Sequence, residues 1–84
     1  MKVNLFYTHT ISERHRLVLQ KGEFLSGICY KGFYMSLFLV EDQFVEVFYN
    51  IKRKSIEAVE LADTEAKHFV LYAAGVDIND AFDN

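Results

Sequence analysis

Apolar residues gather in four short runs along the middle of the chain, and these runs predict a sheet. Each run has the length and the aromatic and β-branched content typical of a strand. The four runs are Phe24–Tyr30, Phe33–Val40, Phe44–Asn50 and Ile56–Ala62. Short polar stretches separate them at 31–32, 41–43 and 52–55, and connections this short join only antiparallel neighbours. The pattern therefore predicts a four-stranded antiparallel meander.

A helix is predicted before the sheet, because residues 10–22 supply signals for both of its ends. Thr10 and Glu13 stand at the spacing of a capping box, in which the Thr10 hydroxyl accepts from the Glu13 amide and the carboxylate reaches back. Lys21 suits the negative end of a helix, and Gly22 suits a left-handed residue just after that end. A strand at Arg16–Gln20 is the alternative, since the apolar residues there also alternate.

After the last strand, the spacing of apolar residues changes to that of a helix. Asp63 or Thr64 can cap this helix, and Gly75 ends it. Its apolar positions recur every three to four residues, at Ala66, Phe69, Val70 and Ala73. We expect one further helical turn at Val76–Phe82. At the other end of the chain, we expect Lys2–Thr8 to form either a short strand or an extended arm. The predicted fold class is α+β, with an N-terminal helix, the meander, and a C-terminal helix packed on the sheet.

The two central strands are apolar on both faces, unlike the strands of a sheet that has one face in water. One helix on each face would cover them; alternatively, both helices cover one face and leave the other to a partner. In the second arrangement the exposed residues are Tyr34, Phe38, Phe44 and Phe48 around Glu46. Such an aromatic surface is typical of protein interfaces, so these five residues are the predicted interaction site. We expect a two-fold homodimer with Phe48 near its centre.

Two alternatives to this face remain open. A dimer built on a strand edge would use the first strand, because Glu57 and Glu60 discourage pairing along the fourth. The chain could instead be a small-ligand binder or enzyme, with an aromatic pocket between the sheet and the C-terminal helix. The residues predicted to line that pocket are Tyr30, Tyr49, His68 and Tyr72.

The composition agrees with one small domain over residues 1–84. Apolar residues make up 51% of the chain and charged residues 25%, which argues against disorder. Eight Phe and five Tyr supply core volume that a chain of 84 residues otherwise lacks. The formal net charge of −3 argues against nucleic-acid binding, although 14–16 and 52–54 are basic clusters.

The sequence also indicates a cytoplasmic protein with no membrane partner. The apolar run near Met1 is too short for a signal peptide, and no run approaches the ~20 residues of a spanning helix. A single cysteine, Cys29, excludes an internal disulfide framework.

No catalytic or metal-binding motif is recognisable. His9 and His15 are six residues apart, which does not match the spacing of metal ligands on a helix. The acidic tail after Gly75 lacks the glycine and the final glutamate of a calcium loop. Cys29 lies in the middle of a predicted strand, where nothing favours its thiolate. We therefore expect no cofactor and no metal, and an interaction domain rather than an enzyme.

The central strands carry a resemblance to a group of bacterial proteins. The residues concerned are the strand 33–40, the strand Phe44–Asn50 with the pattern F-V-E-V-aromatic-Y, and the run 56–59. This part of the chain resembles short uncharacterised proteins of Bacteroidetes bacteria, which have a similar pair of strands, a polar turn and a final helix. The resemblance implies a bacterial cytoplasmic setting and the same strand register. It implies no activity, ligand or catalytic residue.

Overall fold

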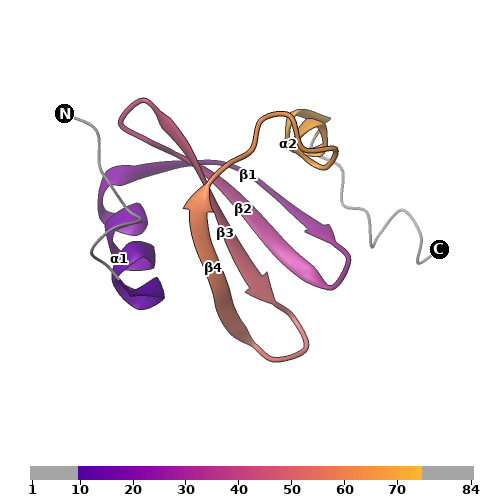
Figure 1. Ribbon diagram of the computed structural model, residues 1–84, viewed down its shortest axis with the longest axis horizontal. Helices are drawn as coiled ribbons and strands as arrows, with labels where there is room; N and C mark the ends of the chain where they lie inside the picture. Colours follow the sequence, from indigo (N-terminus) through magenta and orange to yellow (C-terminus); the bar gives the residue numbers. More distant parts are fainter. Residues whose placement is uncertain (1–9, 75–84) are drawn as a thin grey trace.

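The computed structural model describes residues 10–74 of the 84-residue chain. In chain order the elements are α1 (Ile11–Lys21), β1 (Gly22–Tyr30), β2 (Phe33–Val40), β3 (Gln43–Asn50), β4 (Ser55–Leu61) and α2 (Phe69–Ala74) (Figure 1). The strand order is β1-β2-β3-β4, with every neighbouring pair antiparallel. The predicted α+β fold, a meander between two helices, is confirmed. The predictions for Lys2–Thr8, Gly75 and Val76–Phe82 lie outside the described residues.

The predicted capping box starts α1. The Glu13 amide donates to Thr10 Oγ1 at 3.2 Å, and the Thr10 amide donates to Glu13 Oε1 at 3.0 Å. These bonds satisfy two amides that would otherwise have no partner at the helix end. α1 then continues to Lys21, so the alternative strand at Arg16–Gln20 is wrong.

Gly22 does not take the left-handed conformation predicted for a helix end. Its backbone is extended, with φ −98° and ψ 159°, and it opens β1 directly. Close packing explains the glycine instead. A Cβ at this position would lie 2.6 Å from the Val18 carbonyl oxygen and 3.0 Å from the Val40 side chain. The missing side chain lets β1 follow α1 without an intervening loop.

Residues with positive φ form the tight connections between strands. Lys31 and Gly32 have φ of 51° and 87°, as a two-residue hairpin turn between β1 and β2 requires. Glu41 and Lys54, each with φ 57°, lie in the next two turns. These short turns keep consecutive strands side by side in the meander.

A β-bulge in each edge strand changes which side chains face each helix. In β1 the register shifts between Phe24 and Ser26, which leaves Leu25 as an extra residue. In β4 the extra residue is Glu57. Because side chains alternate along a strand, an extra residue reverses the facing of those beyond it. Phe24 therefore faces α1, whereas Ser26 faces α2.

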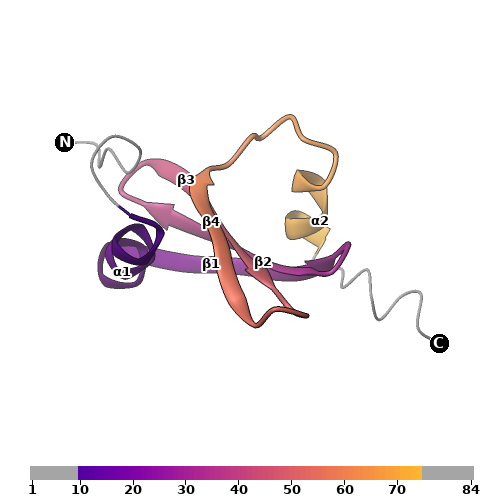
Figure 2. The ribbon, with the colours of Figure 1, turned by 60° about the horizontal axis from the view of Figure 1, so that its bottom comes forward.

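The two helices cover opposite faces of the sheet (Figure 2). On the α1 face, the buried cluster contains Val18, Phe38, Val40, Val45, Val47 and Val59. On the α2 face, the buried cluster contains Ile28, Met35, Leu37 and Tyr72. Of the two arrangements that the apolar strands allowed, the one with a helix on each face is the one that forms.

α2 is shorter than the helix predicted from Asp63 or Thr64. The Asp63 carboxylate accepts from the Glu65 amide at 2.9 Å, but the backbone then makes bonds over three residues, from Ala66 to Asp63 and from Phe69 to Ala66. Such tight turns rise more per residue than an α-helix does. This suits a chain that must cross from β4 to a position over β1, where α2 packs (Figures 1 and 2).

Candidate functional site

β3 places one carboxylate in an apolar environment. Glu46 lies between Val45 and Val47, and only 2% of it is exposed. It pairs with Leu37 of β2, which belongs to the cluster on the α2 face. A buried carboxylate is costly unless hydrogen-bond donors replace the water that it loses. The groups that donate to Glu46 therefore define the candidate site.

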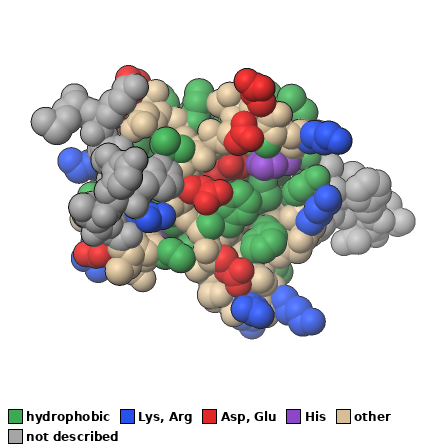
Figure 3. Space-filling model, viewed as in Figure 1, with side chains coloured by type: hydrophobic (Ala, Val, Ile, Leu, Met, Phe, Trp, Pro, Cys, Tyr) green, Lys and Arg blue, Asp and Glu red, His purple; other side chains and the backbone are tan. Residues whose placement is uncertain are grey.

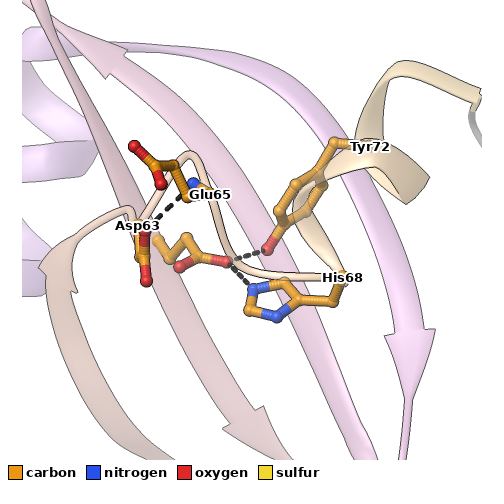
Figure 4. Close-up of polar contacts among 5 residues, drawn as sticks. Asp63, Glu65, His68 and Tyr72 are labelled. Carbon is orange, nitrogen blue, oxygen red and sulfur yellow. Dashed lines mark hydrogen bonds and ion pairs between the residues drawn. The ribbon is translucent and has the colours of Figure 1, made fainter.

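Two side chains from the C-terminal segment meet at a single oxygen of Glu46 (Figure 4). His68 Nε2 lies 2.7 Å from Glu46 Oε2, and the Tyr72 hydroxyl donates to the same oxygen at 2.8 Å. An ionised carboxylate only accepts, so Nε2 carries its proton when it bonds to that form of Glu46. His68 and Tyr72 are four residues apart, so both project from the same side of the chain as it enters α2.

Tyr72 is held in its neutral, donating form. Burial raises the pKa of its hydroxyl well above the ordinary value of 10.0, and the hydrogen bond to Glu46 and the charge of that carboxylate raise it further. Loss of the phenol proton would place a second negative charge beside Glu46 in a buried position. At neutral pH, Tyr72 is therefore a hydrogen-bond donor and not an acid or a nucleophile.

Aromatic rings enclose His68. Its ring centroid lies 5.9 Å from that of Tyr30, 6.4 Å from that of Phe48 and 6.1 Å from that of Tyr72. A carboxylate–histidine pair can orient a ring and hold a proton. In this site the pair joins the segment before α2 to β3.

A second contact joins α2 to β1. Ser26 Oγ donates to the Tyr72 carbonyl oxygen at 2.9 Å, and Ser26 faces α2 because the bulge at Leu25 reverses the alternation of β1. Cys29 pairs with Tyr34 on the α1 face, so its thiol does not belong to the site. The cluster therefore anchors the C-terminal segment to two strands, β3 through Glu46 and β1 through Ser26.

Three of the four residues predicted to line a pocket share the α2 face. The rings of Tyr30 and Tyr72 each lie about 6 Å from the ring of His68, at 5.9 Å and 6.1 Å between centroids. Tyr49 does not join them, because its partners across the strands are Tyr34 and Ile56, on the α1 face. The pocket predicted from all four residues therefore does not form as a single site.

The five residues predicted to form one interaction surface do not share a face. The α1 face holds Tyr34 and Phe38, and the α2 face holds Phe44, Glu46 and Phe48. Partners directly across antiparallel strands lie on the same face, and the partner of Phe38 is Val45, one position from Glu46. Phe38 is also only 8% exposed, within the core beneath α1. Which residues share a face within β2 and within β3 follows from simple alternation, but which faces of the two strands combine depends on their register.

An open apolar groove lies between α2 and the sheet, and we name it the β1–α2 groove. It has a volume of about 280 Å³ and is lined by Leu25, Ser26, Leu37, Phe44, Phe69, Tyr72 and Ala73. Leu25 and Phe44 remain 41% and 40% exposed. The bulge turns Leu25 toward the groove, and Phe44 meets Phe69 edge to face at 5.9 Å. Leu25 and Phe44 are thus exposed apolar side chains at the groove.

A second hollow, the β4 groove, lies on the same face of the sheet. It has a volume of about 360 Å³ and is lined by Phe33, Phe48, Glu57, Ala58 and Glu60. The rings of Phe33 and Phe48 meet edge to face with centroids 6.1 Å apart. Glu57 reaches the groove as the extra residue of the β4 bulge. The lining therefore combines two aromatic rings with two carboxylates and contains no basic side chain.

The sequence matches no protein-family model, no curated protein and no solved structure. The resemblance of the central strands to short Bacteroidetes proteins therefore stays a prediction. Within residues 10–74, no three His, Cys, Asp or Glu side chains are grouped so that they could hold a metal ion. None of the helices in this part of the chain is long and apolar enough to span a membrane.

The hydrogen-bond partners of Glu46 were not predicted from the sequence. The sequence prediction placed Glu46 in an exposed patch and assigned His68 and Tyr72 to a separate pocket. A signal was present, since a lone acid between valines in a strand that is apolar on both faces needs donors. A histidine and a tyrosine four residues apart in the next helical pattern are suitable donors. Nothing comparable in the sequence indicated the two grooves, because the lining of each includes the extra residue of a β-bulge.

Proposed function

We propose that this chain is a small non-enzymatic protein-interaction domain that self-associates through the β1–α2 groove. The observation that carries the proposal is the exposure of Leu25 and Phe44 at an apolar groove beside an edge strand. Apolar side chains gathered in this way gain free energy when a second copy removes them from water. Of the five residues predicted from the sequence for the interaction site, Phe44 is the one that lines this groove.

Side-chain contact is favoured over strand pairing as the basis of the dimer. β1 is an edge strand with a single charged residue, Glu23, so charge does not protect it. However, the bulge at Leu25 interrupts the regular row of backbone groups that a partner strand would need. A two-fold axis would instead set Leu25 and Phe44 of each copy against the groove of the other.

The expected affinity is low. Burying the exposed two-fifths of Leu25 or Phe44 contributes about 1 kcal/mol per side chain, or about 4 kcal/mol for the four in a dimer. Association itself costs at least about 4 kcal/mol in lost translation and rotation. The remaining groove walls and a few hydrogen bonds must supply the net free energy. We therefore expect dissociation in the high micromolar to millimolar range.

Sedimentation velocity over about 10 µM to about 1 mM protein tests this proposal. The wild-type chain is expected to shift toward a dimer at the top of this range, and Leu25→Asp and Phe44→Asp are expected to remain monomers. Ile51→Asp is the matched control, because Ile51 is as exposed as Phe44, at 40%, but lies in the turn between β3 and β4. Circular dichroism checks that each variant is folded.

Two results would contradict self-association through the groove. One is a wild-type chain that stays monomeric at about 1 mM. The other is a dimer that both groove variants leave intact while they remain folded. Loss of the dimer in Ile51→Asp as well would show that added charge, rather than the groove, controls association.

A small-ligand binder is the second candidate, favoured by the position of the β1–α2 groove between the sheet and the C-terminal helix. Tyr72, one of the predicted pocket residues, contributes to its lining. Its volume of about 280 Å³ is just below the usual range of ligand sites. The dye anilinonaphthalene sulfonate is a suitable probe in dilute protein. Fluorescence enhancement that Phe44→Asp abolishes would support this candidate, and no enhancement would exclude an apolar ligand site.

The proposal includes a bacterial cytoplasmic setting. Its support is the single cysteine, which forms no internal disulfide, together with the resemblance of the central strands to short Bacteroidetes proteins. Fractionation of the native organism's cells, with detection of the chain in the soluble cytoplasmic fraction, tests this setting.

A further inference from the structure

The β4 groove combines an aromatic lining with carboxylates, and we propose that it binds a lysine side chain of a basic partner protein. This site is separate from the surface proposed for self-association. α2 packs against β1, whereas the β4 groove is lined from β2, β3 and β4. Figure 3 shows hydrophobic side chains in the lower centre of this side of the molecule, over β3 and β4, with acidic side chains around them.

The charges at the groove favour a cation. Glu57 accepts a hydrogen bond from Asn50 Nδ2 at 3.2 Å and lies 3.8 Å from Arg53 Nη1, an exposed pair of little strength. The Glu60 side chain makes no hydrogen bond or ion pair with any residue in the range 10–74. It also stands directly across from the buried Glu46, and like charges in this position repel each other. A bound cation would relieve that repulsion.

The aromatic lining suits the rest of a lysine side chain. The four methylene groups of lysine can lie along apolar surface while the ammonium group remains at the rim. The Phe33 and Phe48 rings offer such a surface, and a ring face also attracts an ammonium group within about 6 Å. Glu57 and Glu60 can then accept hydrogen bonds from the ammonium group. A free metal ion would make no use of the rings.

The partner is expected to be a different protein rather than a second copy of this one. The chain carries a formal net charge of −3, which attracts a positively charged protein at long range. Pairing β4 with β4 would bring Glu57 and Glu60 of both copies close together. Lys31, two residues before Phe33 in the chain, is already engaged, because its Nζ lies 5.2 Å from the centre of the Tyr30 ring. Charge complementarity therefore selects a basic partner.

The experiment is a titration of the full-length, isotope-labelled chain with a short peptide, followed by amide chemical shifts. The probe is an acetylated and amidated peptide of alternating valine and lysine, and the control peptide has glutamate at each lysine. Shifts are expected at Phe33, Phe48 and the β4 residues 57–60. The Leu25→Asp background keeps the protein monomeric, so failure of this proposal and failure of the proposed self-association can be distinguished.

Substitutions identify the groups responsible. Glu60→Gln is expected to weaken binding by about tenfold, and Phe33→Leu is expected to weaken it severalfold while keeping the groove apolar. Glu23→Gln, an exposed glutamate on the opposite edge strand, is the matched control and should leave the affinity unchanged. Raising the salt from about 50 mM to about 300 mM should weaken binding of the wild-type chain.

Three results would overturn the proposal. They are absence of shifts with the lysine peptide, equal binding of the glutamate peptide, and an affinity that Glu60→Gln leaves unchanged in a folded chain. Spermidine serves as a further probe, because it offers ammonium groups without a polypeptide. If spermidine binds as tightly as the peptide at the same residues, the occupant is a free amine and not a partner protein.

Discussion

The hydroxyl of Tyr72 can be removed with little change in packing, so Tyr72→Phe tests the buried cluster directly. The ring would keep its edge-to-face contacts with Phe69 at 5.8 Å and with His68 at 6.1 Å. The variant loses one hydrogen bond of 2.8 Å to the buried Glu46 carboxylate. A bond to a charged group contributes about 1.5–3 kcal/mol, and His68 remains as a second donor. We therefore expect the free energy of unfolding to fall by about 1.5–2 kcal/mol.

The same contact predicts a distinct dependence on pH. The pKa of Tyr72 is raised in the folded chain and has its ordinary value of 10.0 in the unfolded chain. The stability from this difference is fully present below about pH 10 and is lost above it, because the unfolded chain releases a proton that the folded chain retains. Each pH unit above 10 costs the wild-type chain about 1.4 kcal/mol that Tyr72→Phe does not lose. The stability difference between the two proteins should therefore shrink from about pH 9 to about pH 11.

Urea unfolding followed by circular dichroism at about pH 7, 9 and 11 measures both effects. Tyr34→Phe is the control, because it removes the hydroxyl of an exposed tyrosine and should change stability by less than about 0.5 kcal/mol at neutral pH. A cost for Tyr72→Phe no larger than that of the control would refute the role of the hydrogen bond. So would a difference between wild type and Tyr72→Phe that stays constant from about pH 9 to about pH 11.

Three further substitutions test the packing of the ends and the sheet. Thr10→Ala removes the capping box of α1 and should lower the free energy of unfolding by about 1 kcal/mol in urea denaturation; no change would mean that the cap is not formed in solution. Gly22→Ala should lower the free energy of unfolding by more than about 2 kcal/mol in the same measurement, because the new Cβ would lie 2.6 Å from the backbone carbonyl oxygen of Val18. That oxygen can move away only if α1 moves with it. Gly27→Ala should cost less than Gly22→Ala, because the new Cβ would overlap the Tyr34 hydroxyl, which ends an exposed side chain that can rotate away. We expect shifted Tyr34 ring resonances with little loss of stability. A larger loss of stability than in Gly22→Ala would contradict this.

The parts of the fold that were predictable have local causes. The capping box at Thr10 and the turn at Lys31-Gly32 each depend on residues close together in sequence, and both formed as expected. Gly22 shows the limit of local reasoning, because a glycine after a helix suggests a left-handed end, whereas contact with Val40 of a later strand decides its role. α2 shows the same limit, since its apolar spacing could not indicate that the chain must first cross the sheet.

The sequence by itself determined that Glu46 would need partners if buried, because a carboxylate in an apolar strand cannot remain without donors. Only the tertiary structure decided that His68 and Tyr72, 22 and 26 residues further along, provide them. The sequence likewise determined which residues share a face within β2 and within β3, but not which strand faces combine. Side chains alternate with a period of two, so a single extra residue at Leu25 or Glu57 reverses the facing of those beyond it. Whether a bulge forms depends on the packing of the whole sheet, and each groove has such a residue in its lining.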